Sequence, residues 1–244
     1  MSKVIVITGA GVGLGRTLAR RFANDGERVV LLGRTQSKVE TAAEEIGHGS
    51  IGLLCDVGDP DSVRAAFHHI AAHHGCVDVL INNAAIFEPF KLVDATDAQI
   101  QNAIGANLAG PLLCARAAIP LMRRGSTIIN VSSESVEIPL PHLIVYQTTK
   151  AGIECFGKKL SQELEPEGIR VSTVRCGQMF EEGKHWDVDM EAAMAFHQAA
   201  MAVGLNLRER AISQFTSLES VFRMLIDLPS DLRVEFVDAS ARHS

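Results

Sequence analysis

The chain has 244 residues, of which 47% are hydrophobic and 21% are charged, and its formal net charge is −6 at pH 7. These proportions are typical of a soluble globular protein that buries a sizeable core. The acidic balance argues against nucleic-acid binding, and no apolar run approaches the roughly 20 residues that span a bilayer.

The N-terminal segment MSKVIVITGA enters an apolar strand directly, and it is too short and too poor in basic residues to be a signal peptide. The cysteines form no CxxC pair and are odd in number, which indicates reduced thiols: Cys55, Cys76, Cys114, Cys155 and Cys176. Both observations predict a cytoplasmic protein.

Short apolar runs recur along the chain, and each is a predicted strand. Their near-continuous Val, Ile and Leu content indicates strands that are buried on both faces, as in a parallel sheet. The runs are KVIVIT (3–8), RVVLLG (28–33), IGLLCDV (51–57), VDVLIN (77–82), STIINVS (126–132), IRVSTV (169–174) and LRVEFVD (232–238).

The stretches between these runs carry helix-start signals. Asp59 is a good N-cap before Pro60, and capping boxes are expected at Ser37…Glu40, Thr96…Gln99 and Thr216…Glu219. Strands that alternate with helices predict an α/β fold, a Rossmann-like doubly wound parallel sheet of about seven strands with helices on both faces. Because no linker or repeat is found, we expect a single domain over residues 1–244.

Histidines cluster in FHHIAAHHG, where helical spacing places His69 and His73 on one face. No cysteine or carboxylate completes a ligand set nearby. We therefore predict a solvated helix end and no metal site.

One connection is unusually long. From Gln178 to about Ser213 the chain holds no predicted strand and contains the only tryptophan, Trp186, which suggests a lid or binding insertion. One helix face there carries Met190, Met194, His197 and Met201. Methionine adapts to irregular apolar shapes, so we expect a lid over an apolar substrate, with an ordinary packed helix face as the alternative.

The first predicted strand ends in TGAGVGLG, just before a helix, where ligands bind in open parallel sheets. Its glycines let the backbone approach a pyrophosphate, which the helix N-terminus attracts: Gly9, Gly11, Gly13 and Gly15. The spacing is not GxGxxG, because Leu14 stands where that pattern requires glycine, and no P-loop GK[ST] follows. The position of this loop nevertheless predicts a dinucleotide site.

The second predicted strand ends at Gly33-Arg34, where an acid would hold the ribose of NAD or an arginine the 2′-phosphate of NADP. The acid is absent and Arg34 is present, so we predict NADP, with NAD as the alternative; Arg16 is a candidate second cation. The next strands end in Asp56-Val57 and in NNAA, which includes Asn83 and Ala84. These residues are expected to line the adenine and ribose, unless they serve only as turns.

The single tyrosine, Tyr146, stands one helical turn before Lys150, so both side chains share a face. A nearby ammonium lowers the pKa of a phenol from its ordinary value of about 10, which gives a general acid usable near neutral pH. Ser133 ends the fifth predicted strand and can meet Tyr146 over the same crevice. Alone, the pair is also compatible with an ordinary helix surface.

Together these motifs resemble the short-chain dehydrogenase/reductase family: TGxxxGxG, an NNAG-like motif, an asparagine in the next helix, a serine and YxxxK, over essentially the whole chain. The resemblance implies an NAD(P)-dependent enzyme that interconverts a small-molecule alcohol and carbonyl. It makes Tyr146 the general acid/base and Lys150 the residue that lowers its pKa and binds the nicotinamide ribose. It makes Ser133 a donor to the substrate oxygen and Asn107, in GANLAG, the holder of a relay water.

The expected cofactor contacts are Gly9, Gly11, Gly13, Leu14, Gly15, Arg34, Asp56, Val57, Asn83, Ala84, Tyr146, Lys150 and Gly177. Three departures from the family pattern stand out. Cys176-Gly177 replaces Pro-Gly, Glu181 replaces a threonine, and the last strand lacks a glycine-containing ending. The first two lie at the nicotinamide end of the cofactor.

The resemblance also implies a homodimer or homotetramer. The helices that run from Asn107 and Tyr146 are rich in apolar residues, which are expected at subunit contacts unless they pack only on their own sheet: Leu108, Leu112, Ile153, Phe156 and Leu160. The alternative function is a catalytically silent dinucleotide-binding regulator of the same fold. Such a protein would be expected to lose Tyr146 or Lys150, and this chain has both.

Overall fold

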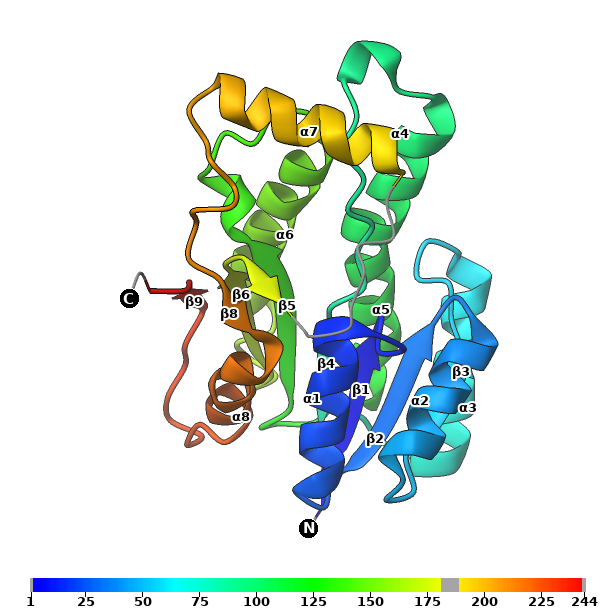
Figure 1. The fold of residues 1–244 in the computed structure, drawn as a ribbon. Helices are drawn as coiled ribbons and strands as arrows, with labels where there is room; N and C mark the ends of the chain where they lie inside the picture. Colours follow the sequence, from blue (N-terminus) through cyan, green and yellow to red (C-terminus); the bar gives the residue numbers. More distant parts are fainter. Residues whose placement is uncertain (1, 181–188, 243–244) are drawn as a thin grey trace.

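The computed structural model describes residues 2–180 and 189–242. Seven strands form one parallel sheet in the order β3-β2-β1-β4-β5-β6-β9 (Figure 1). Their bounds are β1 (Val4–Thr8), β2 (Arg28–Gly33), β3 (Ile51–Leu54), β4 (Val79–Asn82), β5 (Thr127–Ser133), β6 (Arg170–Cys176) and β9 (Phe236–Ala239). The order reverses between β1 and β4, which creates a ligand crevice at the carboxyl ends of the strands. The predicted doubly wound parallel sheet is confirmed.

Helices cover both faces of this sheet. One layer contains α1 (Gly13–Asn24), α2 (Gln36–Ile46) and α8 (Glu219–Ile226). The other contains α3 (Pro60–His74), α5 (Gly110–Ala118) and α6 (Ile144–Glu163). In β1, Ile5 and Ile7 pack in the first layer and Val6 packs in the second, all fully buried. Burial of such a side chain contributes about 1.5–3 kcal/mol, and the double cover explains the continuous apolar runs.

Two of the predicted helix starts are confirmed. The Asp59 carboxylate accepts from the backbone N–H groups of Asp61 and Ser62 at the start of α3, with Pro60 in the first turn. Thr96 and Gln99 form a reciprocal capping box before α4 (Asp97–Ile104). In both cases a side chain satisfies N–H groups that the helix itself leaves without a partner.

The other two starts are wrong. Helix α2 begins after Thr35, so Ser37 lies within its first turn rather than before it. Thr216 falls inside a 3-10 turn (Phe215–Leu218), and α8 begins at Glu219. The last strand also begins later than predicted, because its pairing with β6 starts at Phe236.

A continuous helical stretch runs from Asp97 to Leu121 and includes α4, a π-helical turn (Gly105–Ala109) and α5. By length and composition it would qualify as a membrane span, a test that core helices of soluble proteins also pass. In this fold α4 packs against α6, and α5 packs against α3 and β4. The stretch therefore forms part of the helical layer over the sheet.

The long connection after β6 contains β7 (Met179–Phe180), α7 (Met190–Ala202) and β8 (Ser213–Gln214), and the two strands pair with each other. Helix α7 lies across the end of the molecule opposite the N-terminus (Figure 1). The expected methionine face is not packed: the exposed fractions of Met190, Met194 and Met201 are 75%, 57% and 57%. Phe196 and Ala200 are buried instead. Trp186 and Glu181 lie outside the described residues.

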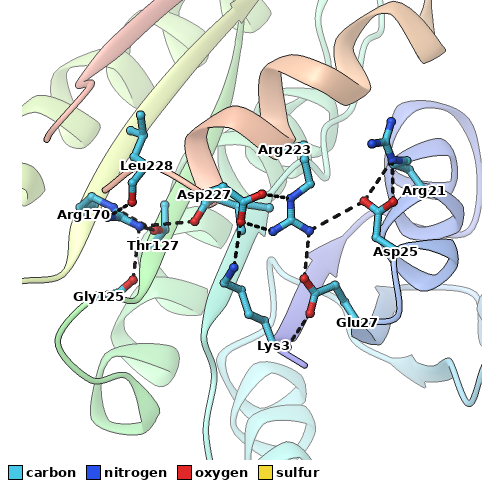
Figure 2. A network of polar contacts seen from close by, with 11 residues as sticks. Lys3, Arg21, Asp25, Glu27, Gly125, Thr127, Arg170, Arg223, Asp227 and Leu228 are labelled. Atoms are coloured by element: carbon cyan, nitrogen blue, oxygen red, sulfur yellow. Dashed lines mark hydrogen bonds and ion pairs between the residues drawn. The ribbon is translucent and has the colours of Figure 1, made fainter. Parts of the chain in front are cut away.

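A polar network joins α8 to the amino ends of the strands, far from the crevice (Figure 2). The Arg223 guanidinium donates to Asp227 at 2.6 Å and to Glu27 at 2.9 Å, and Lys3 Nζ lies 2.9 Å from Asp227. These contacts fasten α8 to the strand and turn that flank α1.

Candidate active site

An open cleft of ≈ 1360 Å³ lies at the carboxyl ends of the strands, from the loop after β1 to the end of β6. It brings together most of the expected site residues: Gly9, Gly11, Gly13, Leu14, Arg34, Asp56, Val57, Asn83, Ala84, Ser133, Tyr146, Lys150 and Gly177. Gly15 and Asn107 do not line the cleft; both are buried next to it.

The loop after β1 and the end of β4 form a tight cradle. Gly9 has a φ of +65°, and a Cβ there would lie 2.8 Å from Ala84 Cα. A Cβ on Gly15 would lie 2.6 Å from Asn83 Nδ2. Only glycine permits this close approach. The N-cap of α1, Val12, makes no side-chain cap hydrogen bond, so the helix start is suited to an anionic ligand.

Thr8, which the sequence reasoning missed, holds this cradle together. Its hydroxyl oxygen accepts from the backbone N–H groups of Asn83 and Ala84, each at 3.0 Å. Asn83 Nδ2 in turn donates to Thr8 O at 2.9 Å. The sequence did carry a signal for this role, because Thr8 is a hydroxyl residue at the end of an otherwise apolar strand.

Cations gather at the β2 end of the cleft, where Arg34 and Lys38 both line it and are exposed. Lys38 lies against the glycine loop, since a Cβ on Gly11 would be 3.3 Å from Lys38 Cβ. Arg16 lies 3.5 Å from Glu45 in an ion pair. Arg16, the candidate second cation, also lines the cleft, and Lys38, in the first turn of α2, is a further cation there that the sequence reasoning missed.

Helix α6 carries Tyr146 and Lys150 close to the sheet. A Cβ on Gly157 would lie only 2.2 Å from Thr173 Oγ1, so glycine allows the helix to approach β6. Lys150 is buried, and its Nζ lies 5.6 Å from the centroid of the Tyr146 ring. The same ammonium donates to Val131 O at 2.8 Å.

Burial controls the protonation of this pair. It raises the pKa of Tyr146 to about 12, although a hydrogen bond with the Ser133 hydroxyl acts in the opposite direction. It lowers the pKa of Lys150 to about 8. The predicted lowering of the tyrosine pKa is therefore not what this structure shows. The loss of water around the phenol dominates, and the lysine proton is held by Val131 O.

Asn107 occupies the π-helical turn, a feature that is frequent at functional sites. Its Oδ1 accepts from Ile86 N at 2.7 Å, and its Nδ2 donates to Ile86 O at 2.9 Å and to Thr149 Oγ1 at 3.3 Å. Thr149 Oγ1 donates to Tyr146 O at 2.7 Å. The amide therefore links the loop after β4 to the turn of α6 that carries the tyrosine.

An apolar wall stands beside Tyr146. The Phe87 ring packs edge-on against the phenol ring at 4.9 Å and against the Phe196 ring of α7 at 6.4 Å. Leu140 and Leu143 belong to the same cluster, with Ile138, Leu205 and Leu207 packed against it. Sequence reasoning missed Phe87, although it follows the NNAA motif closely.

Comparison with known proteins decides the family. Residues 3–184 match the sequence profile of a family described as short chain dehydrogenase. The chain is a short-chain dehydrogenase/reductase. A D-xylose 1-dehydrogenase of Caulobacter vibrioides is 36% identical over 180 residues, which cover 72% of this chain and 71% of that protein. The protein is thus an oxidoreductase of the NAD(P)-dependent class that acts on CH–OH and C=O groups.

Solved structures of other short-chain dehydrogenases/reductases have the same fold. A metagenomic member in complex with NADP has a TM-score of 0.79 at 26% identity and covers 100% of this chain and 99% of its own. A 3-ketoacyl-(acyl-carrier-protein) reductase from Brucella melitensis, complexed with NADH, has a TM-score of 0.80 at 26% identity, with 98% and 96% covered.

The structure accommodates Cys176 and Gly177, which stand where the short-chain dehydrogenase/reductase pattern has Pro-Gly. Cys176 is buried, and burial raises the pKa of its thiol to about 12, so the thiol stays neutral. Gly177 N donates to Ala239 O, and a Cβ on Gly177 would lie 2.9 Å from Ser240 Cα. The close approach of β9 therefore explains the glycine.

The expected subunit contacts need correction. Ile153 and Leu160 are buried within their own chain, and Leu160 packs in the cluster between α6 and the sheet. Leu112 is exposed. The alternative, packing on the protein's own sheet, therefore holds for Leu160, and Ile153 is likewise buried within its own chain.

Proposed function

We propose that the protein is an NADP(H)-dependent oxidoreductase that interconverts a small carbonyl compound and a secondary alcohol, with Tyr146 as general acid/base. The observation that carries this proposal is one cleft that joins the glycine cradle, the cation pair and the Ser133–Tyr146–Lys150 group. Each part has a separate physical role, and together they match a single reaction.

The cradle fits a dinucleotide, because Gly9 and Gly15 let the loop after β1 pack directly on Ala84 and Asn83. Gly11, Val12 and Gly13, at the start of α1, line the cleft where a pyrophosphate would bind. The start of α1 would hold the pyrophosphate, and the nicotinamide ribose would lie at Tyr146 and Lys150. When bound, the nicotinamide ring supplies or accepts a hydride. The adenosine would lie along Asp56, Val57, Asn83 and Ala84, and Gly177 would flank the nicotinamide end.

Arg34 and Lys38 would bind the 2′-phosphate that distinguishes NADP from NAD. A phosphate of nearly two negative charges favours a guanidinium and an ammonium together. The Asp56 carboxylate, which would repel a phosphate, accepts from Gly58 N at 2.9 Å and so serves its own turn.

The proton chemistry favours reduction near neutral pH. A phenol with a pKa of about 12 keeps its proton and can donate it to a developing alkoxide, while Ser133 offers a second donor to the same oxygen. Donors placed before the reaction stabilise the charge as it forms. Lys150, with a pKa of about 8, remains largely cationic at pH 7 and supports the same charge. Both amide protons of Asn107 are donated to Ile86 O and Thr149 Oγ1, so Asn107 would hold a relay water through the remaining lone pair of its Oδ1.

We further propose that residues 178–213 form a lid within a single domain spanning residues 1–244. Arg210 Nη2 lies 2.7 Å from Glu134 Oε2, and both side chains are largely buried. Because Glu134 directly follows Ser133, this ion pair ties the segment after α7 to the catalytic strand.

The free cysteines are consistent with a cytoplasmic location, and a homodimer or homotetramer remains the proposed assembly.

The test is NADPH consumption with 3-ketoacyl thioesters and apolar ketones, together with NADP⁺ reduction with aldoses, and Tyr146→Phe is the control. Turnover by the wild type that the variant loses supports the proposal. Tight NADPH binding without turnover across the panel supports the silent regulator instead.

A further inference from the structure

An ion pair lies directly behind the catalytic group. The Arg175 guanidinium, on β6, grips the Glu154 carboxylate, on α6, through two bonds: Nε to Oε1 at 2.9 Å and Nη2 to Oε2 at 2.7 Å. The exposed fractions of the two side chains are only 12% and 17%. Two more exposed carboxylates, Glu137 and Asp238, lie on the outer side of the guanidinium.

The pair is connected to the catalytic strand through Ser132. The Ser132 hydroxyl donates to Glu154 Oε1 at 2.7 Å and lies 3.4 Å from Lys150 O. Ser132 and Arg175 are register partners on β5 and β6, one position before Ser133 and Cys176. The carboxylate therefore sits over one rung of the sheet and contacts both strands of that rung.

Glu154 shares a helix face with the catalytic residues, because Tyr146, Lys150 and Glu154 follow one another at intervals of one turn. Any rotation or sliding of α6 moves all three side chains together. The bidentate guanidinium–carboxylate geometry fixes both distance and orientation. The contact that holds Glu154 over the sheet therefore also sets where Tyr146 stands relative to Ser133.

We propose that Arg175 and Glu154, with Ser132, are positioning residues that hold the tyrosine–lysine face of α6 in register with Ser133. They touch no reacting atom and act only through the helix. This inference rests on the proposed function. We call this group of Arg175, Glu154 and Ser132 the clamp. A displacement of about 1 Å of a reacting group is enough to lower a rate about 10²-fold, so loss of the clamp is expected to lower kcat.

The kinetic test compares Glu154→Gln, Arg175→Met and the double variant with the wild type. We expect kcat to fall at least about tenfold while Kd for NADPH changes less than about twofold. The double variant should lose about as much kcat as either single variant, because both substitutions remove the same ion pair. Arg223→Met, in the network of Figure 2, is the matched control: it should lower Tm and leave kcat unchanged.

A spectroscopic readout separates this inference from the proposed function. Tyr146 is the only tyrosine, so phenolate absorbance reports it alone even if no substrate is turned over. Loss of the clamp should move the phenol titration toward the ordinary pKa of about 10, and Arg223→Met should not. Where the ion-pair variants fail to fold, Ser132→Ala removes one hydrogen bond and should give smaller changes of the same sign. Unchanged kcat and an unchanged phenol titration in folded variants would overturn the inference, as would additive kinetic losses.

Discussion

Replacement of Lys38 by alanine removes one half of the cation pair at the adenosine end of the cleft. A charge-assisted hydrogen bond contributes about 1.5–3 kcal/mol. Both Arg34 and Lys38 are exposed, so solvent screening favours the lower end, and about 1.4 kcal/mol per cation corresponds to tenfold in affinity. Together the two cations predict a preference of roughly 10²-fold for NADPH over NADH.

The assay is a titration of both cofactors against the wild type, Lys38→Ala and Arg34→Ala, with the exposed Lys159→Ala on α6 as the control. Lys38→Ala should weaken NADPH about tenfold and change NADH less than about twofold. The preference should also shrink as ionic strength rises, because the cations are exposed. Equal weakening of both cofactors by Lys38→Ala, or a wild type that prefers NADH, would refute this reasoning.

Three further outcomes are expected. Tyr146→Phe should bind NADPH normally and lose at least about 10²-fold in turnover; a near-normal kcat would exclude the general-acid role. Gly157→Ala should lower the free energy of unfolding by about 1–3 kcal/mol in urea titrations, because its Cβ would meet Thr173 Oγ1, and an unchanged midpoint would contradict this close packing. Lys150 has a folded-state pKa of about 8, below its ordinary value of 10.5, so the unfolded chain binds more protons between these values. The Lys150 contribution to stability should therefore grow with pH across that window, while the buried thiols and Tyr146, whose pKa values are raised, contribute in the opposite direction. Stability should fall more steeply with pH in Lys150→Met than in the wild type; an identical slope in both proteins would argue against the buried ammonium.

Local features of the chain determined the sheet, the glycine loop and two of the helix caps. Each depends on the backbone within a few residues or on a repeating pattern. The Asp59 carboxylate caps its own helix, and Thr96 pairs with Gln99 in the next turn. The spacing that places Tyr146 and Lys150 on one face is likewise a property of the helix alone. Because the strands are apolar on both faces, helices had to cover both faces of the sheet, whatever their exact positions.

Contacts between distant segments were decided only by the tertiary structure. Lys38 reached the glycine loop while Arg16 paired with Glu45, because the packing of α1 and α2 set those distances. Burial of Phe196 rather than the methionine face followed from the side of α7 that packs against Leu140 and Leu143.

The state of the catalytic pair is also a tertiary property. The neighbouring ammonium predicted a low tyrosine pKa, but removal of the phenol from water raises it to about 12. The Arg175–Glu154 clamp joins β6 to α6, and Ser132 of β5 binds the same carboxylate. Pairing between segments this far apart in the chain leaves no periodic trace in either one, because it depends on strand register and on how closely the helix packs. The sequence therefore identified the reagents, and the fold decided how they are held.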